Sequence, residues 1–193
     1  PAERVVESHD DMTVQLGSRA LRLIDTPGHA RHHHCIWDEA SRGWFTGDTF
    51  GISYREFDSA AGPWLFPTTT PVQFEPAAMR VSVQRMLAAQ PQVIFPTHFG
   101  PITALDRVTA QFNALLDTFE SGGLALRETL QREGRYGDKA AVEDALMAFM
   151  QRELVASALA SGAPLDEARA RELLRLDATL NAQGMAVWLA KAG

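Results

Sequence analysis

The hydrophobic pattern of the chain changes once, near residue 105, and this change most constrains the fold. Residues 5–58 contain short apolar runs separated by polar or glycine-containing turns, a pattern typical of β-strands. From residue 105 onward, apolar residues recur with the period of an amphipathic helix. We therefore expect an α/β fold organised in two parts, residues 1–104 and residues 105–193.

The first part is predicted to contain two antiparallel strand pairs and a later single strand. The run TVQL-GS-RALRLID places Gly17 and Ser18 between two strands, as in a two-residue hairpin turn. The run HHCIWD-EASRG-WFTGD repeats the pattern with a longer turn. After a Pro-rich irregular loop over residues 59–74, a helix is expected to open at Glu75 and Pro76. The apolar run QVIFP then predicts a further short strand.

The second part is predicted to be helical throughout. Its first helix has an apolar face over residues 108–119 and is expected to end at Gly122 and Gly123, because glycine suits a helix C-cap. Further helices are expected over residues 124–133, over residues 138–160, and from residue 164 or 165 to residue 190.

Composition argues against several classes of function. The chain has 193 residues, 46% of them apolar and 22% charged, which is typical of a soluble globular protein. The net charge of -6, without a basic stripe, argues against nucleic acid as a partner. No apolar run approaches the length of about 18 residues needed to span a membrane, and the start PAERVVESHDD lacks the pattern of a signal peptide. We expect a cytoplasmic protein with no membrane partner, in which the single Cys35 is a small buried residue.

Three of the predicted strands are followed by a histidine or an aspartate. His29 lies in TPGHA, Asp48 in TGDTF and His98 in PTHFG. Imidazole nitrogen and carboxylate oxygen suit zinc, iron or manganese, and ligands from separate strand ends can converge at one edge of a sheet. Judged by residue type alone, each of the three also fits a structural role as a hydrogen-bonded side chain.

Three further histidines, His32, His33 and His34, lead into the next strand. Because side chains alternate between the faces of a strand, these three cannot all bind one ion. Two interpretations remain open: either one of them supports a metal ligand through a hydrogen bond, or all are satisfied by backbone and water.

The order and spacing of the three motifs resemble the second half of the metallo-β-lactamase fold superfamily, the glyoxalase II-like hydrolases. The resemblance covers roughly residues 5–103. It implies the second half of an αββα sandwich with a mixed or antiparallel sheet, here followed by a helical C-terminal extension. It also implies that His29 completes a first metal site, that Asp48 bridges two metals, and that His98 belongs to the second site.

The resemblance further implies hydrolysis of an ester, thioester or lactone in a small-molecule substrate. One or two ions, of zinc or alternatively iron or manganese, would activate a water near neutral pH, and Asp48 would orient it as a catalytic residue. Trp64, Phe66 and the PTTTP run lie where family members place substrate-contacting elements, although packing against the sheet is an equal alternative. Tyr54 and Arg55 are weaker candidates.

The chain departs from the family in lacking its HxHxDH motif. That motif supplies the remaining metal ligands from the first half of the domain, and its absence implies an incomplete site. A lone second half would also leave an apolar sheet face bare, at a cost of about 25 cal/mol per Å². We therefore expect a fragment of a hydrolase, inactive by itself, which forms a homo-oligomer to cover that face. A helical tail folded over the face is the alternative.

Two other functions remain open at this point. One is a di-iron redox protein of the same fold, which would normally require a flavin partner domain. The other is a non-catalytic interaction module, which is the literal interpretation of a chain without HxHxDH.

Overall fold

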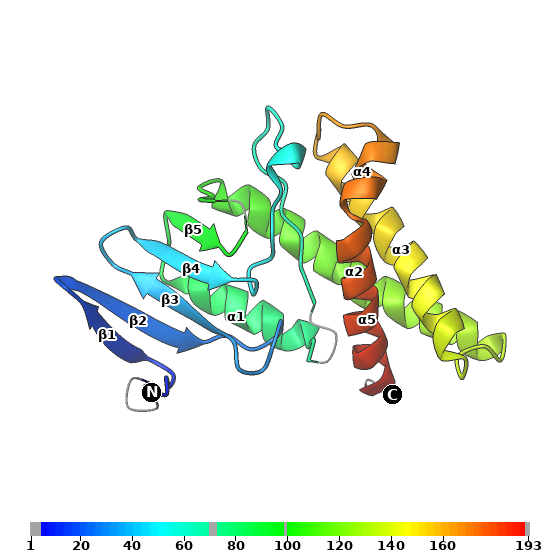
Figure 1. The fold of residues 1–193 in the computed structure, drawn as a ribbon, viewed down its shortest axis with the longest axis horizontal. Helices are drawn as coiled ribbons and strands as arrows, with labels where there is room; N and C mark the ends of the chain where they lie inside the picture. The colour runs from blue at the N-terminus through cyan, green and yellow to red at the C-terminus, as the bar shows by residue number, and fades with distance from the viewer. Residues whose placement is uncertain (1–4, 70–72, 99, 192–193) are drawn as a thin grey trace.

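The computed structural model describes residues 5–69, 73–98 and 100–191 and contains, within them, one mixed five-stranded sheet and five α-helices (Figure 1). The strands are β1 (Met12–Leu16), β2 (Arg19–Asp25), β3 (His34–Asp38), β4 (Gly43–Gly47) and β5 (Val93–Pro96). The helices are α1 (Pro76–Ala88), α2 (Leu105–Arg132), α3 (Lys139–Ala160), α4 (Glu167–Leu173) and α5 (Arg175–Lys191), with a short 3-10 helix η2 (Arg55–Phe57). The predicted α/β class is confirmed.

The strands lie in the sheet in chain order, β1-β2-β3-β4-β5. The first four are antiparallel, and β5 pairs with β4 in parallel after the crossover through α1. Leu16 pairs with Arg19, which confirms the two-residue turn at Gly17 and Ser18. The longer turn between β3 and β4 is confirmed as well, because Asp38 pairs with Gly43.

Only one face of the sheet is covered by helices of this chain, as far as the described residues extend. On the covered face, Trp44 is fully buried and its indole Nε1 donates a hydrogen bond to the carbonyl of Met86 in α1, at 2.9 Å. Figure 1 looks onto the opposite face, and no helix passes in front of the strands there. This outer face, as we call it, carries Met12, Val14, Leu21, Leu23, Ile36, Phe45 and Phe95.

The predicted helix end at Gly122 and Gly123 is wrong, because α2 continues through both glycines to Arg132. A Cβ atom on Gly122 would lie 2.3 Å from Cζ of Phe149 in α3, and one on Gly123 would lie 2.5 Å from Cε of Met185 in α5. The glycines therefore allow α3 and α5 to approach α2 closely. The helix predicted over residues 124–133 is the second half of α2.

Helices α3 and α4 begin at side-chain caps, and Asp166 accepts from the backbone N–H of Arg169 at the start of α4. Asp138 accepts hydrogen bonds from the backbone N–H groups of Ala140 and Ala141 at the start of α3, close to the predicted boundary. The last predicted helix is divided into α4 and α5, with the fully buried Leu174 between them.

Side chains from both predicted parts meet in one buried cluster. The rings of Phe50 and Phe112 are 5.7 Å apart, and Trp64 Nε1 donates to Ser157 Oγ at 3.1 Å.

The predicted division after residue 104 coincides with the start of α2 and stays a prediction. None of the helices in the described part of the chain is long and apolar enough to cross a membrane.

Candidate functional site

The three residues predicted as metal ligands lie together at one edge of the sheet. Strands β2, β4 and β5 all run in the same direction, so their carboxyl ends reach the same edge. His29 Nε2 is 3.7 Å from Asp48 Oδ2, and His98 Nε2 is 3.9 Å from Asp48 Oδ1. The carboxylate of Asp48 therefore faces the two imidazoles through different oxygens. The role of these side chains as ligands remains a prediction.

A backbone hydrogen bond determines which nitrogen of His29 faces Asp48. His29 Nδ1 is 2.9 Å from the carbonyl oxygen of Thr68. A carbonyl can only accept, so Nδ1 carries a proton, and in the neutral imidazole the lone pair is then on Nε2. The side chain is only 13% exposed, which restricts its movement. Metal-binding histidines in proteins are commonly oriented by such a hydrogen bond.

Asp48 has an unsatisfied oxygen at the centre of this group. Its Oδ1 is buried and has no hydrogen-bond partner among the described residues. Its Oδ2 faces His29 Nε2 at 3.7 Å, and a carboxylate oxygen and an imidazole lone pair this close repel each other unless a proton or a cation lies between them. A cation would satisfy both groups. The donor types and their directions thus fit a metal ion.

The set of candidate metal ligands is nevertheless incomplete. Among residues 5–69, 73–98 and 100–191, no group of three or more His, Cys, Asp or Glu side chains is arranged to hold one ion. Asp48 turns one oxygen to each imidazole, so His29 and Asp48, or His98 and Asp48, would supply two ligands to an ion beside either histidine. Zinc in proteins usually takes four ligands, and the remainder would have to be water or residues from elsewhere.

His33 contacts the backbone of Asp48, and whether it supports a metal ligand or is simply satisfied by backbone groups stays a prediction. Its Nε2 accepts a hydrogen bond from the backbone N–H of Asp48 at 3.4 Å, and its Nδ1 is 3.0 Å from Thr26 Oγ1. Burial, and then the proximity of His29, lowers the pKa of His33 to about 4. His33 is therefore neutral at pH 7. His32 and His34 are exposed.

The contact with His33 requires glycine at the end of β4. Gly47 has a φ of 51°, and a Cβ atom there would lie 2.3 Å from His33 Nε2. Any side chain would displace the imidazole from beneath Asp48.

Cys35 lies in the core and contacts the same Thr26 hydroxyl as His33 does. Its thiol donates to the carbonyl of Thr46 at 3.3 Å and lies 3.1 Å from Thr26 Oγ1. Burial raises the pKa of the Cys35 thiol to about 12, so it is protonated at neutral pH and is no metal ligand in that form. The prediction of a small buried residue is confirmed.

The aromatic residues considered as substrate contacts are packing residues instead. Trp64 and Phe66 are fully buried with their rings stacked 4.6 Å apart, because they fill the core between the sheet and α3. Residues 70 and 71 of the PTTTP run lie outside the described residues. Tyr54 donates to both carboxylate oxygens of Asp177 in α5, at 2.9 and 3.0 Å, and Arg55 pairs with Asp58 at 3.0 Å.

Sequence reasoning missed the part that α5 plays near the site. The fully buried Asn181 holds residues on both sides of Thr68. The available signal was the placement of Asp177 and Asn181, two polar residues four positions apart on the apolar side of a helix. A buried polar side chain requires a partner, and this placement predicts one.

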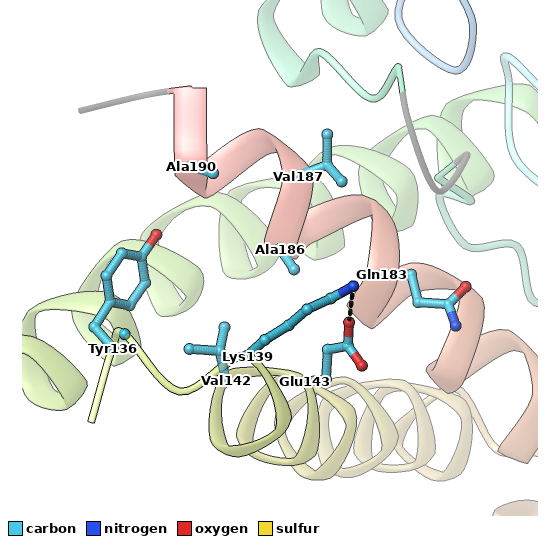
Figure 2. A pocket seen from close by; sticks show the side chains of 9 residues that line it. Tyr136, Lys139, Val142, Glu143, Gln183, Ala186, Val187 and Ala190 are labelled. Carbon is cyan, nitrogen blue, oxygen red and sulfur yellow. Dashed lines mark ion pairs between the residues drawn. The ribbon is translucent and has the colours of Figure 1, made fainter.

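A cavity of about 550 Å³ lies away from these residues, between α3, α5 and the turn before α3 (Figure 2). Its polar contact is an ion pair between Lys139 and Glu143 at 3.6 Å, one turn apart on α3. Tyr136, Val142, Ala186, Val187 and Ala190 add mostly apolar walls. No set of reactive groups converges there, so the cavity is not the candidate site.

Comparison with known proteins supports the resemblance seen in the motifs. The family model described as Metallo-beta-lactamase superfamily matches residues 1–98. The Metallo-beta-lactamase fold-containing protein ST1585 of Sulfurisphaera tokodaii is 32% identical over 101 residues, which are 52% of this chain and 35% of that protein. The matched segment thus spans about a third of the relative.

Two solved structures also align with parts of the chain. The crystal structure of ST1585 from Sulfolobus tokodaii aligns with a TM-score of 0.46 and 28% identity, covering 56% of this chain and 40% of that one. That of the metallo-beta-lactamase family protein TTHA1429 from Thermus thermophilus aligns with a TM-score of 0.45 and 16% identity, covering 96% of this chain and 49% of that one.

Proposed function

This chain belongs to the metallo-beta-lactamase superfamily, and from that premise we propose that it is the metal-binding second half of a hydrolase for ester, thioester or lactone substrates. The observation that carries the proposal is the carboxylate of Asp48, which faces His29 and His98 through separate oxygens and has a buried, unsatisfied Oδ1. This arrangement suits a carboxylate that bridges two cations.

Each residue of the chain has a distinct part in this proposal. His29 would bind an ion through Nε2, because its Nδ1 donates to the Thr68 carbonyl. Asp48 would tie the two halves of the site together, with its backbone held by His33. His98, half exposed, would lie on the open side, where a substrate can reach it. A bound zinc, iron or manganese ion would supply a Lewis acid and an activated water at neutral pH.

We further propose that this chain is inactive by itself and needs a complementary half or a second copy. The support is the incomplete ligand set of the described residues and the bare outer face of the sheet. Metal binding by the chain alone should accordingly be weaker than in a complete four-ligand site.

The proposal is tested first by metal binding. Calorimetric titration of the metal-free chain with zinc should give measurable binding that Asp48→Ala and His29→Ala each weaken at least about tenfold. His34→Ala, which removes an exposed histidine on β3, is the matched control and should bind as the wild type does. Equal binding by all four proteins, or none by the wild type, would contradict the proposal.

The hydrolase assignment is tested separately. Thioester and lactone substrates are offered to the chain alone and to the chain mixed with a separately made HxHxDH-containing half, before and after chelation. We expect chelator-sensitive hydrolysis only in the mixture. If the mixture binds zinc in a single assembly and no substrate is hydrolysed, the hydrolase assignment fails while the metal site stands.

A non-catalytic interaction module is the second candidate, favoured by the same incomplete ligand set. In that case Asp48→Ala would leave zinc binding, assembly and thermal stability unchanged. The titration above therefore separates the two functions.

A further inference from the structure

Helix α5 is joined to the candidate site through residues 67–69. Asn181, fully buried in α5, accepts a hydrogen bond from the backbone N–H of Thr69 at 2.8 Å through its Oδ1. Its Nδ2 donates to the carbonyl of Pro67 at 3.3 Å. One amide side chain thus holds the backbone on both sides of Thr68.

The hydroxyl of Thr69 adds a second link to the same helix. Thr69 Oγ1 lies 3.3 Å from the carbonyl oxygen of Asn181 and 3.4 Å from that of Leu180. The segment is therefore bonded to α5 through both its backbone and a side chain. Its middle residue, Thr68, turns its carbonyl to His29 Nδ1 at 2.9 Å.

We propose that α5 is a positioning element of the site, in which Asn181 sets the orientation and tautomer of His29 through the Thr68 carbonyl. The part of this inference that concerns metal binding by His29 rests on the proposed function. The part that concerns the tautomer of His29 depends only on the hydrogen bonds. Asn181 touches no reacting group and acts only through residues 67–69.

A second contact from α5 reaches the segment that follows Asp48. Asp177 lies one turn before Asn181 on the same side of the helix and is 7% exposed. Its carboxylate accepts from the hydroxyl of Tyr54 at 2.9 and 3.0 Å. Thus α5 contacts both the segment that hydrogen-bonds to His29 and the segment that follows Asp48.

Asp177 and Asn181 are polar residues at positions of α5 that face the apolar core. Asp177 and Asn181 lie among the buried Leu174, Ala178, Ala182 and Met185, where an apolar side chain would pack without desolvation cost. Both polar groups are instead directed to the segments that carry the site. Packing alone does not account for this choice of residue.

The decisive measurement is the tautomer of His29 in the metal-free protein, read from long-range proton–nitrogen NMR correlations. The wild type should have the proton on Nδ1. Asn181→Leu keeps the size of the side chain and removes both hydrogen bonds, so it should give a mixed tautomer and at least about tenfold faster exchange of the Thr69 amide. Zinc affinity should fall about 10- to 100-fold.

The matched control is Met185→Ala, which removes a buried side chain from the same helix where it packs against Gly123 of α2. It should lower stability yet leave the His29 tautomer and the Thr69 exchange rate as in the wild type. If Asn181→Leu does not fold, Thr69→Val decides, because it removes only the hydroxyl links and should shift the same two readouts in the same direction to a smaller extent.

A folded Asn181→Leu protein that keeps the wild-type His29 tautomer would overturn the inference, whatever its Thr69 exchange rate, and Thr69→Val is judged in the same way if Asn181→Leu does not fold. Absence of zinc binding by the wild type would instead overturn the proposed function and leave this inference to be decided by the NMR readouts. The two failures are therefore distinguishable.

Discussion

At the scale of single residues, Asp38 ties the start of β2 to the turn between β3 and β4. Its carboxylate accepts hydrogen bonds from Arg19 Nε at 3.2 Å, from Ser41 Oγ at 2.5 Å and from the Ser41 backbone N–H at 3.1 Å. The hydrogen bonds from Arg19, and secondly those from Ser41, hold the pKa of Asp38 below its usual value. The ionised form is therefore favoured in the folded state.

Stability should depend on pH through this carboxylate. Because the folded-state pKa is lowered, the contribution is complete above the unfolded pKa of about 3.9 and is lost as pH falls through the folded-state pKa. Asp38→Asn should lower the free energy of unfolding at pH 7 by about 1–3 kcal/mol. Urea denaturation between pH 7 and pH 2 should show the difference from wild type shrinking at the acid end. A difference that is constant with pH would contradict this account, and Glu7→Gln, at an exposed position, is the control.

The residue scale also marks the limit of what the sequence could predict about the site. The contexts of His29, Asp48 and His98 were enough to predict that they would lie together, since each follows a strand that runs to the same sheet edge. Which of His32, His33 and His34 would support them could not be predicted, because that depends on the space beneath Gly47. The Thr68 carbonyl is a backbone group, and no side-chain pattern reveals it.

At the scale of elements, Gly122 and Gly123 lower the intrinsic stability of α2 as a helix but allow α3 and α5 to pack closely against it. In an exposed helix, alanine is more stable than glycine by about 1 kcal/mol. Here Gly122→Ala would place a methyl group 2.3 Å from the rigid ring of Phe149, so we expect destabilisation of about 1–3 kcal/mol in urea denaturation. Gly123→Ala should cost less, because it meets only the flexible end of Met185.

Gly137→Ala is the control for this series. A Cβ atom on Gly137 meets no other atom within 4 Å, so the substitution should change stability by less than about 0.5 kcal/mol. If Gly122→Ala changes the free energy of unfolding as little as Gly137→Ala does, α2 and α3 do not approach each other closely at Gly122.

The elements themselves were largely predictable, and the errors have one physical origin. The apolar runs of the strands, the Gly17 turn and the apolar period of residues 138–160 are local signals, and each marked an element that the structure contains. Gly122 and Gly123 are also a local signal, for a helix end, but the packing of Phe149 and Met185 decides their role. Contacts between elements far apart in the chain override the local preference, and a single sequence does not display them.

At the scale of the whole molecule, the outer face of the sheet is the largest departure from a self-contained fold. Register aligns Met12, Leu23, Ile36, Phe45 and Phe95 in one row across all five strands. Phe45 is 45% exposed, and its ring stacks on that of Phe95 at 4.9 Å. Contiguous apolar surface of this kind usually marks an interface.

We expect a second copy of the chain to cover this face, since two such sheets can pack face to face about 10 Å apart in an isologous dimer. Sedimentation velocity of the wild type over a wide range of concentrations should then reveal a dimer. Phe45→Asp would bury a charge at the centre of the interface, so it should give monomers at concentrations where the wild type is dimeric, with an unchanged circular dichroism spectrum. Val81→Asp, at a 64% exposed position on α1 and thus on the other side of the sheet, should leave the dimer intact. A wild type that stays monomeric throughout would mean that the face awaits a different partner, and the prediction of a homo-oligomer would be wrong.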